Sequence, residues 1–145
     1  MPYTSHMTES NSPTEPIVGI DLGTTNSLVA YCDETGPRIL ESAAGERILP
    51  SVVRLDPDTG NATAIGTEAR RHAIEYPETT VHSIKRLMGR GVDDLGDEVA
   101  QLPYNVVEGE HDTARVRVGE QILSPQQISA MVLRALKQQA EAALQ

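Results

Sequence analysis

The feature that most constrains the fold is the stretch from Ile17 to Ala30, where two apolar runs flank a short polar turn. Ile17 to Leu22 is typical of a buried strand, with one carboxylate, Asp21, near its end. Ser27 to Cys32 is typical of the returning strand, so the two runs predict a β-hairpin. We expect both to be central strands of a sheet and Cys32 to be a small buried hydrophobe. The chemistry of this unit should lie in its turn.

The turn itself consists of Gly23, Thr24, Thr25 and Asn26. Gly23 has no Cβ, so the backbone can bend there and a ligand can approach closely. Successive backbone N–H groups can converge on an anion, and the two threonine hydroxyls add donors. A phosphate beside Asp21 requires a cation between them, and Mg²⁺ is usually held by one or two carboxylates, waters and phosphates. The residues therefore indicate a phosphate site with Mg²⁺ on Asp21, and an ordinary structural turn is the alternative that residue chemistry leaves open.

The string GIDLGTTNS closely resembles the first phosphate-binding hairpin of the seventy-kilodalton heat-shock chaperones, the DnaK family of the actin-like ATPase superfamily. Three further segments resemble the same family, namely LPSVV at Leu49–Val53, a G-x-x-A-[KR] step at Gly66–Arg70 and an S-P-x-Q-I-S helix start at Ser124–Ser129. The resemblance implies an α/β fold, with residues 17–145 as the truncated first lobe of an actin-like, ribonuclease H-like domain. That lobe has a mixed sheet with flanking helices. The resemblance also implies ATP or ADP with Mg²⁺ as ligands, bound at the turn and at Asp21.

A second candidate site is the segment SIKRLMGR, which contains Lys85 and Arg86 between the apolar residues Ile84 and Leu87. By themselves, two such cations would lie at the rim of a helix or turn. The segment resembles the family element whose lysine reaches into the nucleotide cleft and helps to position the attacking water. Carried over by motif position, Lys85 is the catalytic residue, a buried ammonium opposite developing phosphate charge. Arg86 would help to fix the cleft wall.

The function implied by the resemblance is that of an ATP-dependent molecular chaperone of the DnaK type, active in protein folding, heat shock and stress response. Its parent protein would bind unfolded client proteins, a J-domain co-chaperone and a nucleotide exchange factor. KRLMGR and Leu102–Tyr104 favour the HscA-like branch that assists iron–sulfur assembly. A sugar or glycerol kinase of the same superfamily shares the D-x-G-T-T hairpin, and a lobe that keeps its shape without turnover is a third alternative. The second phosphate loop, the adenosine segment and the later catalytic carboxylate do not occur in the sequence, so we expect little ATPase activity from this chain alone.

Composition argues against several other classes of protein, namely nucleic-acid-binding, disulfide-rich, zinc-binding and membrane-spanning proteins. The 145 residues suit about one domain, and four Tyr with no Phe or Trp require an aliphatic core. The net charge of −9 argues against nucleic-acid binding, and a single cysteine excludes an internal disulfide framework or thiolate zinc site. No apolar run is long enough for a membrane span. Residues 1–16 lack the apolar core of a signal peptide, so we expect a disordered leader or an expression remnant on a cytoplasmic protein.

Two helices are predicted with defined starts. Thr67 to Glu75 should be helical, with Thr67 as N-cap and Tyr76–Pro77 as the end. The last helix should begin at Ser124, whose S-x-x-Q pattern with Gln127 is a capping box. Its apolar face comprises Ile128, Met131, Val132, Ala135, Leu136 and Ala143. A continuous strand is predicted over 49–55, between the hairpin and the first helix. Three short strands are predicted between the two helices, over 102–107, 115–118 and 121–123.

Overall fold

The computed structural model describes residues 15–145, so the expected leader lies almost wholly outside the described residues. The strands are β1 Val18–Leu22, β2 Asn26–Asp33, β3 Gly36–Ile39, β4 Leu49–Pro50, β5 Val52–Leu55, β6 Ala62–Ile65, β7 Thr80–His82, β8 Asn105–Glu108, β9 Ala114–Val118 and β10 Gln121–Leu123. The α-helices are α1 Thr67–Arg71, α2 Val92–Leu95, α3 Asp97–Ala100 and α4 Pro125–Ala143. Two 3₁₀ helices complete the set, η1 Ile84–Leu87 and η2 Glu110–Asp112.

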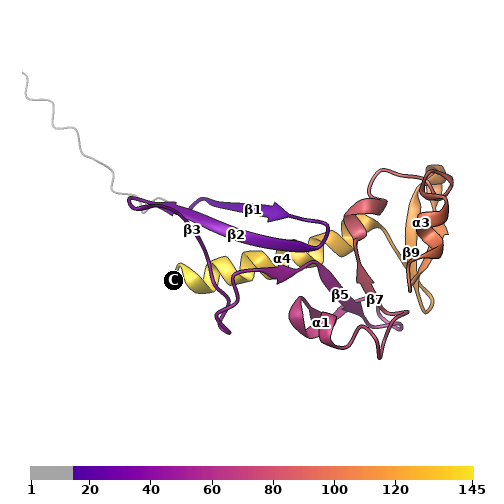
Figure 1. Cartoon of the computed structure of the whole chain (residues 1–145), viewed down its shortest axis with the longest axis horizontal. Helices are drawn as coiled ribbons and strands as arrows, with labels where there is room; N and C mark the ends of the chain where they lie inside the picture. Colours follow the sequence, from indigo (N-terminus) through magenta and orange to yellow (C-terminus); the bar gives the residue numbers. More distant parts are fainter. Residues whose placement is uncertain (1–14) are drawn as a thin grey trace, which may run out of the picture.

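The strands form three small antiparallel sheets. The first has the order β1-β2-β3, with β4 also paired to β2; the second is β6-β5-β7; the third is β10-β9-β8. Figure 1 shows the β1–β2 hairpin on one side of the molecule and the β9 region on the other. The expected α/β composition is confirmed, while every strand pair in residues 15–145 is antiparallel.

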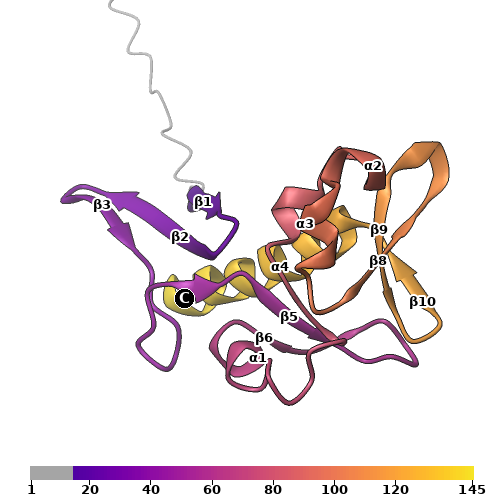
Figure 2. The same cartoon turned by 45° about the vertical axis from the view of Figure 1, so that its right-hand side comes forward.

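Helix α4 connects the three sheets. In Figures 1 and 2 it runs lengthwise through the molecule, beside the β1–β2 hairpin at one end and near β9 at the other. It packs against β2, η1, β1, β5, β6 and β9. The predicted start is confirmed: Ser124 Oγ accepts from Gln127 N at 3.1 Å, and Ser124 N donates to Gln127 Oε1 at 2.8 Å. This reciprocal cap satisfies the backbone N–H groups of Ser124 and Gln127 and fixes where α4 begins.

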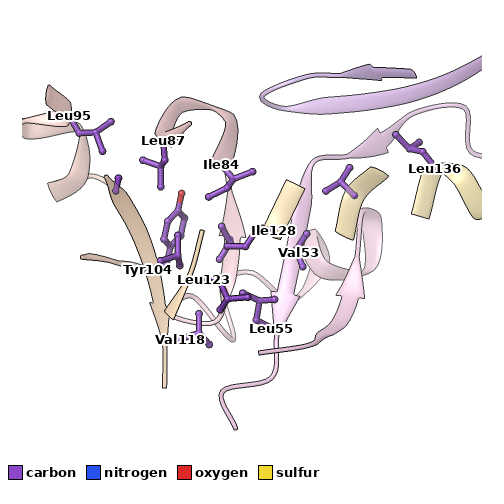
Figure 3. Packing of buried hydrophobic residues seen from close by; sticks show 14 of the residues in the cluster. Val53, Leu55, Ile84, Leu87, Leu95, Tyr104, Val118, Leu123, Ile128 and Leu136 are labelled. Atoms are coloured by element: carbon purple, nitrogen blue, oxygen red, sulfur yellow. The ribbon is translucent and has the colours of Figure 1, made fainter. Parts of the chain in front are cut away.

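The hydrophobic core is aliphatic, as the composition requires. Its largest fully buried side chains include Leu40, Leu55, Leu87, Ile128 and Leu136. Figure 3 shows members of this cluster converging from β5, η1, the β8–β10 sheet and α4. Tyr104 is the single aromatic side chain in the buried core of residues 15–145. One continuous core therefore holds the three sheets together.

Strand β1 does not have the buried, central position predicted for it. It lies at the end of its sheet, and within residues 15–145 no strand pairs with its outer edge. Ile17 is 86% exposed and Ile20 is 39% exposed, and Cys32 on β2 is also exposed rather than buried. β2 is the central strand, as predicted, because β1 and β3 pair with its two edges. An apolar run predicts that a segment is a strand, but the burial of that strand depends on which other elements cover it.

Two local predictions also fail for identifiable reasons. Helix α1 covers only Thr67–Arg71, and its N-cap is Gly66 rather than Thr67. Gly66 has φ of 75°, and a Cβ there would lie 2.3 Å from Leu49 Cδ1, so glycine is needed. The continuous strand predicted over 49–55 is broken at Ser51, because β4 pairs with β2 whereas β5 pairs with β6 and β7.

The other strand predictions are close to the observed ones. The three short strands occur as β8, β9 and β10, with β8 starting three residues later than predicted. No helix in residues 15–145 combines the length and the apolarity needed to cross a membrane.

Candidate functional site

The predicted polar turn joins β1 to β2 and is tightly built around Gly23. A Cβ at this position would lie 2.1 Å from the carbonyl oxygen of Asn26, far inside van der Waals contact. Glycine is therefore required by close approach of the backbone across the turn. Thr24 is half-buried, whereas Thr25 and Asn26 are exposed.

The carbonyl groups of the turn are occupied from the interior. Ser51 Oγ donates to the Gly23 carbonyl at 2.9 Å, and Ser51 N donates to the Thr25 carbonyl at 2.9 Å. No described residue accepts a hydrogen bond from the backbone N–H of Thr24 or Thr25. A turn whose carbonyls are satisfied and whose N–H groups are free can receive an anion.

Asp21 lies one residue before the strand end, on the exposed surface rather than in the buried position predicted. It is opposite Leu28 in the β1–β2 ladder, so strand alternation places it on the other face from Ile20 and Leu22. Its carboxylate forms no ion pair with any residue from 15 to 145. The described residues also contain no group of three or more His, Cys, Asp or Glu side chains placed to hold a metal ion by themselves. A single free carboxylate can hold Mg²⁺ only when water or phosphate supplies its other ligands.

The structure brings the second candidate residue to the same place. Lys85, on η1, donates from Nζ to the Leu22 carbonyl oxygen at 2.8 Å, across 63 positions of sequence. Its side chain is exposed, so the expectation of a buried ammonium is wrong. Ser83, which precedes η1, has a left-handed conformation with φ of 54°. Two sequence segments that were identified separately therefore meet at the end of β1.

A hollow of about 220 Å³ lies beside the turn. Its walls come from the turn, the β4–β5 junction, helix α1 and the end of β7, and its lining residues are Thr24, Thr25, Ser51, Val52, Arg70, Ala73, His82 and Ser83. Asp21, Gly23, Asn26 and Lys85 are outside this lining. Arg70 was matched in the sequence only as the last residue of the G-x-x-A-[KR] pattern. The sequence did not predict that Ser51, His82 and Ser83 would lie at this site. Ser51 was detectable in principle, since a serine interrupting an apolar strand run needs a hydrogen-bond partner when buried.

Two aromatic rings support the segment that carries Lys85. Tyr104 donates its hydroxyl proton to the His82 carbonyl at 2.6 Å, and the two rings meet edge to face with centroids 5.7 Å apart. Burial lowers the pKa of His82, and the nearby Arg86 guanidinium lowers it further. Burial raises the pKa of the Tyr104 hydroxyl, which therefore stays protonated and remains a donor.

A model of the Hsp70 protein family matches residues 17–145. The chain belongs to the Hsp70 family. The fold is accordingly that of the actin-like ATPases, and the resemblance found in the hairpin and in SIKRLMGR is confirmed at the level of the family. Hsp70 proteins are ATP-binding chaperones, so nucleotide, client proteins and co-chaperones are the general ligand classes for this chain.

Proposed function

We propose that the β1–β2 turn and Lys85 form one wall of an Mg²⁺–ATP site in a cytoplasmic chaperone of the DnaK type that acts in protein folding. Gly23, Thr24, Thr25 and Asn26 would bind the nucleotide phosphates. The observation that carries the proposal is the turn itself, whose carbonyls are bonded inward while the N–H groups of Thr24 and Thr25 are free. Two charged groups lie near these donors. The Asp21 carboxylate precedes the turn in the sequence, and the Lys85 ammonium, which comes much later in the sequence, bonds to the Leu22 carbonyl at the end of β1.

Asp21 would hold Mg²⁺, directly or through water, at the edge of the phosphate site. The metal would neutralise charge on the phosphate oxygens when bound. Asp21 is suited to this because it is exposed and unpaired among residues 15–145. Its substitution by Asn keeps the size of the side chain and removes the charge that attracts the cation.

Lys85 would orient the water that attacks the γ-phosphate. Its ammonium donates to the Leu22 carbonyl, one residue from Gly23, and therefore lies next to the turn. In an Hsp70 ATPase that contains this chain, Lys85→Ala should slow single-turnover hydrolysis by roughly 10²–10³-fold and spare nucleotide affinity. Lowered affinity with unchanged hydrolysis would contradict the assigned role.

The hollow beside the turn is smaller than a nucleotide site. Pockets for small ligands commonly measure about 300–1,000 Å³, and this one measures about 220 Å³. A hollow of this size leaves the base and ribose without a surface. We therefore propose that a second lobe supplies the opposite wall and that this chain alone binds nucleotide weakly, with millimolar dissociation constants that correspond to about −4 kcal/mol.

The partners proposed for the complete chaperone are unfolded client proteins, a J-domain co-chaperone and a nucleotide exchange factor. The HscA-like iron–sulfur branch is the second candidate. KRLMGR and Leu102–Tyr104 favour it, and Tyr104 bonds directly to the segment that precedes Lys85. The two branches would share the site described above.

Calorimetric titration of the chain with ADP, with Mg²⁺ and with excess chelator, tests the proposal. We expect Mg²⁺ to strengthen binding in the wild type and Asp21→Asn to lose most of that gain. Asp97→Asn is the matched control, because it removes an exposed carboxylate from the first turn of α3. Equal Mg²⁺ dependence in Asp21→Asn and Asp97→Asn would contradict the metal assignment, and a wild type that does not bind ADP would contradict the site.

A further inference from the structure

Two serine hydroxyls lie beneath the turn and have no part in the proposed chemistry. Ser27 is 1% exposed and Ser51 is 3% exposed. Their Oγ atoms are 2.8 Å apart although the residues are 24 positions apart in the sequence. Buried hydroxyls that make all their hydrogen bonds have only one favourable arrangement, so such a pair can fix the backbone that it contacts.

The direction of each hydrogen bond follows from the atoms available. The Gly23 carbonyl can only accept, so Ser51 donates its single hydroxyl proton to that oxygen at 2.9 Å. Ser51 Oγ must then accept from Ser27, which uses the hydroxyl proton of Ser27. Ser27 Oγ accepts in turn from the N–H of Gly23 at 3.3 Å. The bonds form a closed serine circuit that starts at the N–H of Gly23 and ends at its carbonyl.

This serine circuit determines which way the turn presents its amides. In a trans peptide the carbonyl and the following N–H point in opposite directions, and residues 15–145 contain no cis peptide. Holding the Gly23 carbonyl toward Ser51 therefore turns the N–H of Thr24 outward. The N–H of Ser51 holds the Thr25 carbonyl at 2.9 Å, which turns the N–H of Asn26 away from Ser51.

Ser51 also connects the turn to the segment that carries Lys85. It is the single residue between β4, which pairs with β2, and β5, which pairs with β7. The next residue, Val52, is opposite His82, and η1 with Lys85 begins two residues after His82. Lys85 closes the path by donating to Leu22. Ser51 thus connects the β1–β2 turn to the segment that carries Lys85.

We infer that Ser51, together with Ser27, is a positioning residue for phosphate binding, because the serine circuit holds the amides of the turn in their anion-binding orientation. This inference rests on the proposed function of the turn. Ser51 does not contact the phosphate in this account; it sets the direction of groups that do.

Nuclear magnetic resonance of the ligand-free chain tests whether the circuit sets the turn. Ser51→Ala removes the bond to the Gly23 carbonyl and the bond from Ser27, so it should shift the amide resonances of Thr24 and Asn26 and speed hydrogen exchange at Gly23 by about three- to tenfold. Ser129→Ala is the matched control, because Ser129 is also buried and its hydroxyl has no partner among the described residues. Ser51→Cys, which keeps the size with a weaker donor, should give an intermediate result. If Ser51→Ala does not fold, Ser27→Ala opens the same circuit and should give the same shifts.

Binding of inorganic tripolyphosphate and ADP, each with Mg²⁺, supplies the second readout. Ser51→Ala should weaken both ligands by about three- to tenfold relative to Ser129→Ala, at temperatures where both variants are fully folded. Ser27→Ala combined with Ser51→Ala should cost little more than either alone, because either change opens the circuit. Equal resonances at 23–26 or equal affinities in Ser51→Ala and Ser129→Ala would overturn the inference and leave the proposed function standing. A wild type that binds neither ligand would overturn both.

Discussion

The two ends of the β1–β2 hairpin are stabilised in opposite ways. At the turn, every inward polar group of Gly23 is bonded, through Ser27 and Ser51, and Lys85 holds the last carbonyl of β1. At the other end, β1 has a free outer edge, and Ile17 is 86% exposed. A groove of about 980 Å³ runs between β1 and helix α4 there.

The comparison indicates which end of the hairpin has a backbone fixed by hydrogen bonds. The turn is fixed by directional hydrogen bonds from residues distant in the sequence, so small changes there should alter binding. The outer edge of β1 makes apolar contacts on one face only, so substitutions there should alter association with other molecules more than folding. The following predictions test this difference, beginning with the largest effect on stability.

Gly23→Ala should be the most damaging single change in the hairpin. The added Cβ would lie 2.1 Å from the Asn26 carbonyl, so the turn must open, at a cost of about 1–3 kcal/mol. Mg²⁺–ADP binding should be lost with it. Gly19→Ala, in the preceding strand β1 and with nothing within 4 Å of the added Cβ, is the control. Equal thermal midpoints for the two variants would show that the turn is not constrained as described.

The sequence predicted the local geometry of the turn better than the position of its strands. The bend at Gly23 was identified because that position requires glycine, and the Ser124 cap was identified because a helix start also requires particular residue types. The edge position of β1 could not be predicted, since periodicity reports which residues are apolar and not which elements cover them.

The meeting of Lys85 with Leu22 was implied only through the family resemblance, because nothing local to either residue specifies a contact over 63 positions. The break at Ser51 was missed for a related reason. An apolar run such as LPSVV has the same pattern whether its strand continues in one sheet or passes between two. Ser51 is needed at that break because its N–H and its hydroxyl both bond to the turn.

Tyr104→Phe should loosen the support of the Lys85 segment without changing the hydrophobic core. It removes the 2.6 Å hydrogen bond to the His82 carbonyl, which should lower the free energy of unfolding by about 0.5–1.5 kcal/mol. Hydrogen exchange should increase in η1 more than in the β1–β2 turn. Chemical denaturation measures the first effect, and Tyr31→Phe, at a partly buried tyrosine on the central strand β2, is the control. A uniform increase of exchange across the chain would contradict a local role.

Stability should also depend on pH through His82. Because its pKa is lowered in the folded chain, the unfolded state binds more protons between that lowered pKa and the usual value of 6.5. Stability should therefore fall as the pH decreases through 6.5, and the loss should be complete below the lowered pKa. The groups around the ring are Arg86, Tyr104, the Ser83 hydroxyl and Glu98, and Glu98 lines a second hollow together with His82. Thermal melts of His82→Gln should show a flatter pH dependence than the wild type, whereas His111→Gln, at an exposed position in η2, should retain the wild-type slope.

Ile20→Lys should have the smallest effect on stability, within about 0.5 kcal/mol, because the side chain is already 39% exposed. Its effect should appear in self-association instead. We expect the wild type to associate more as salt screens the net charge of −9, and Ile20→Lys to suppress this by charging the open edge. Ile74→Lys, at a 95% exposed isoleucine away from β1, is the matched control. Light scattering that changes equally in both variants would rule out the β1 edge as the contact.

The most direct test of the central claim, that the β1–β2 turn binds nucleotide phosphates with a metal at Asp21, is paramagnetic resonance broadening by Mn²⁺–ADP. Small amounts of the complex are added to the isotope-labelled chain, and line widths are compared with those in Mg²⁺–ADP. We predict broadening centred on Asp21 and Gly23–Asn26, extending to η1 and strongly reduced in Asp21→Asn. Broadening centred on Asp93 and Asp94 of α2 and Asp112 of η2, which line another hollow, with the turn unaffected, would contradict the account.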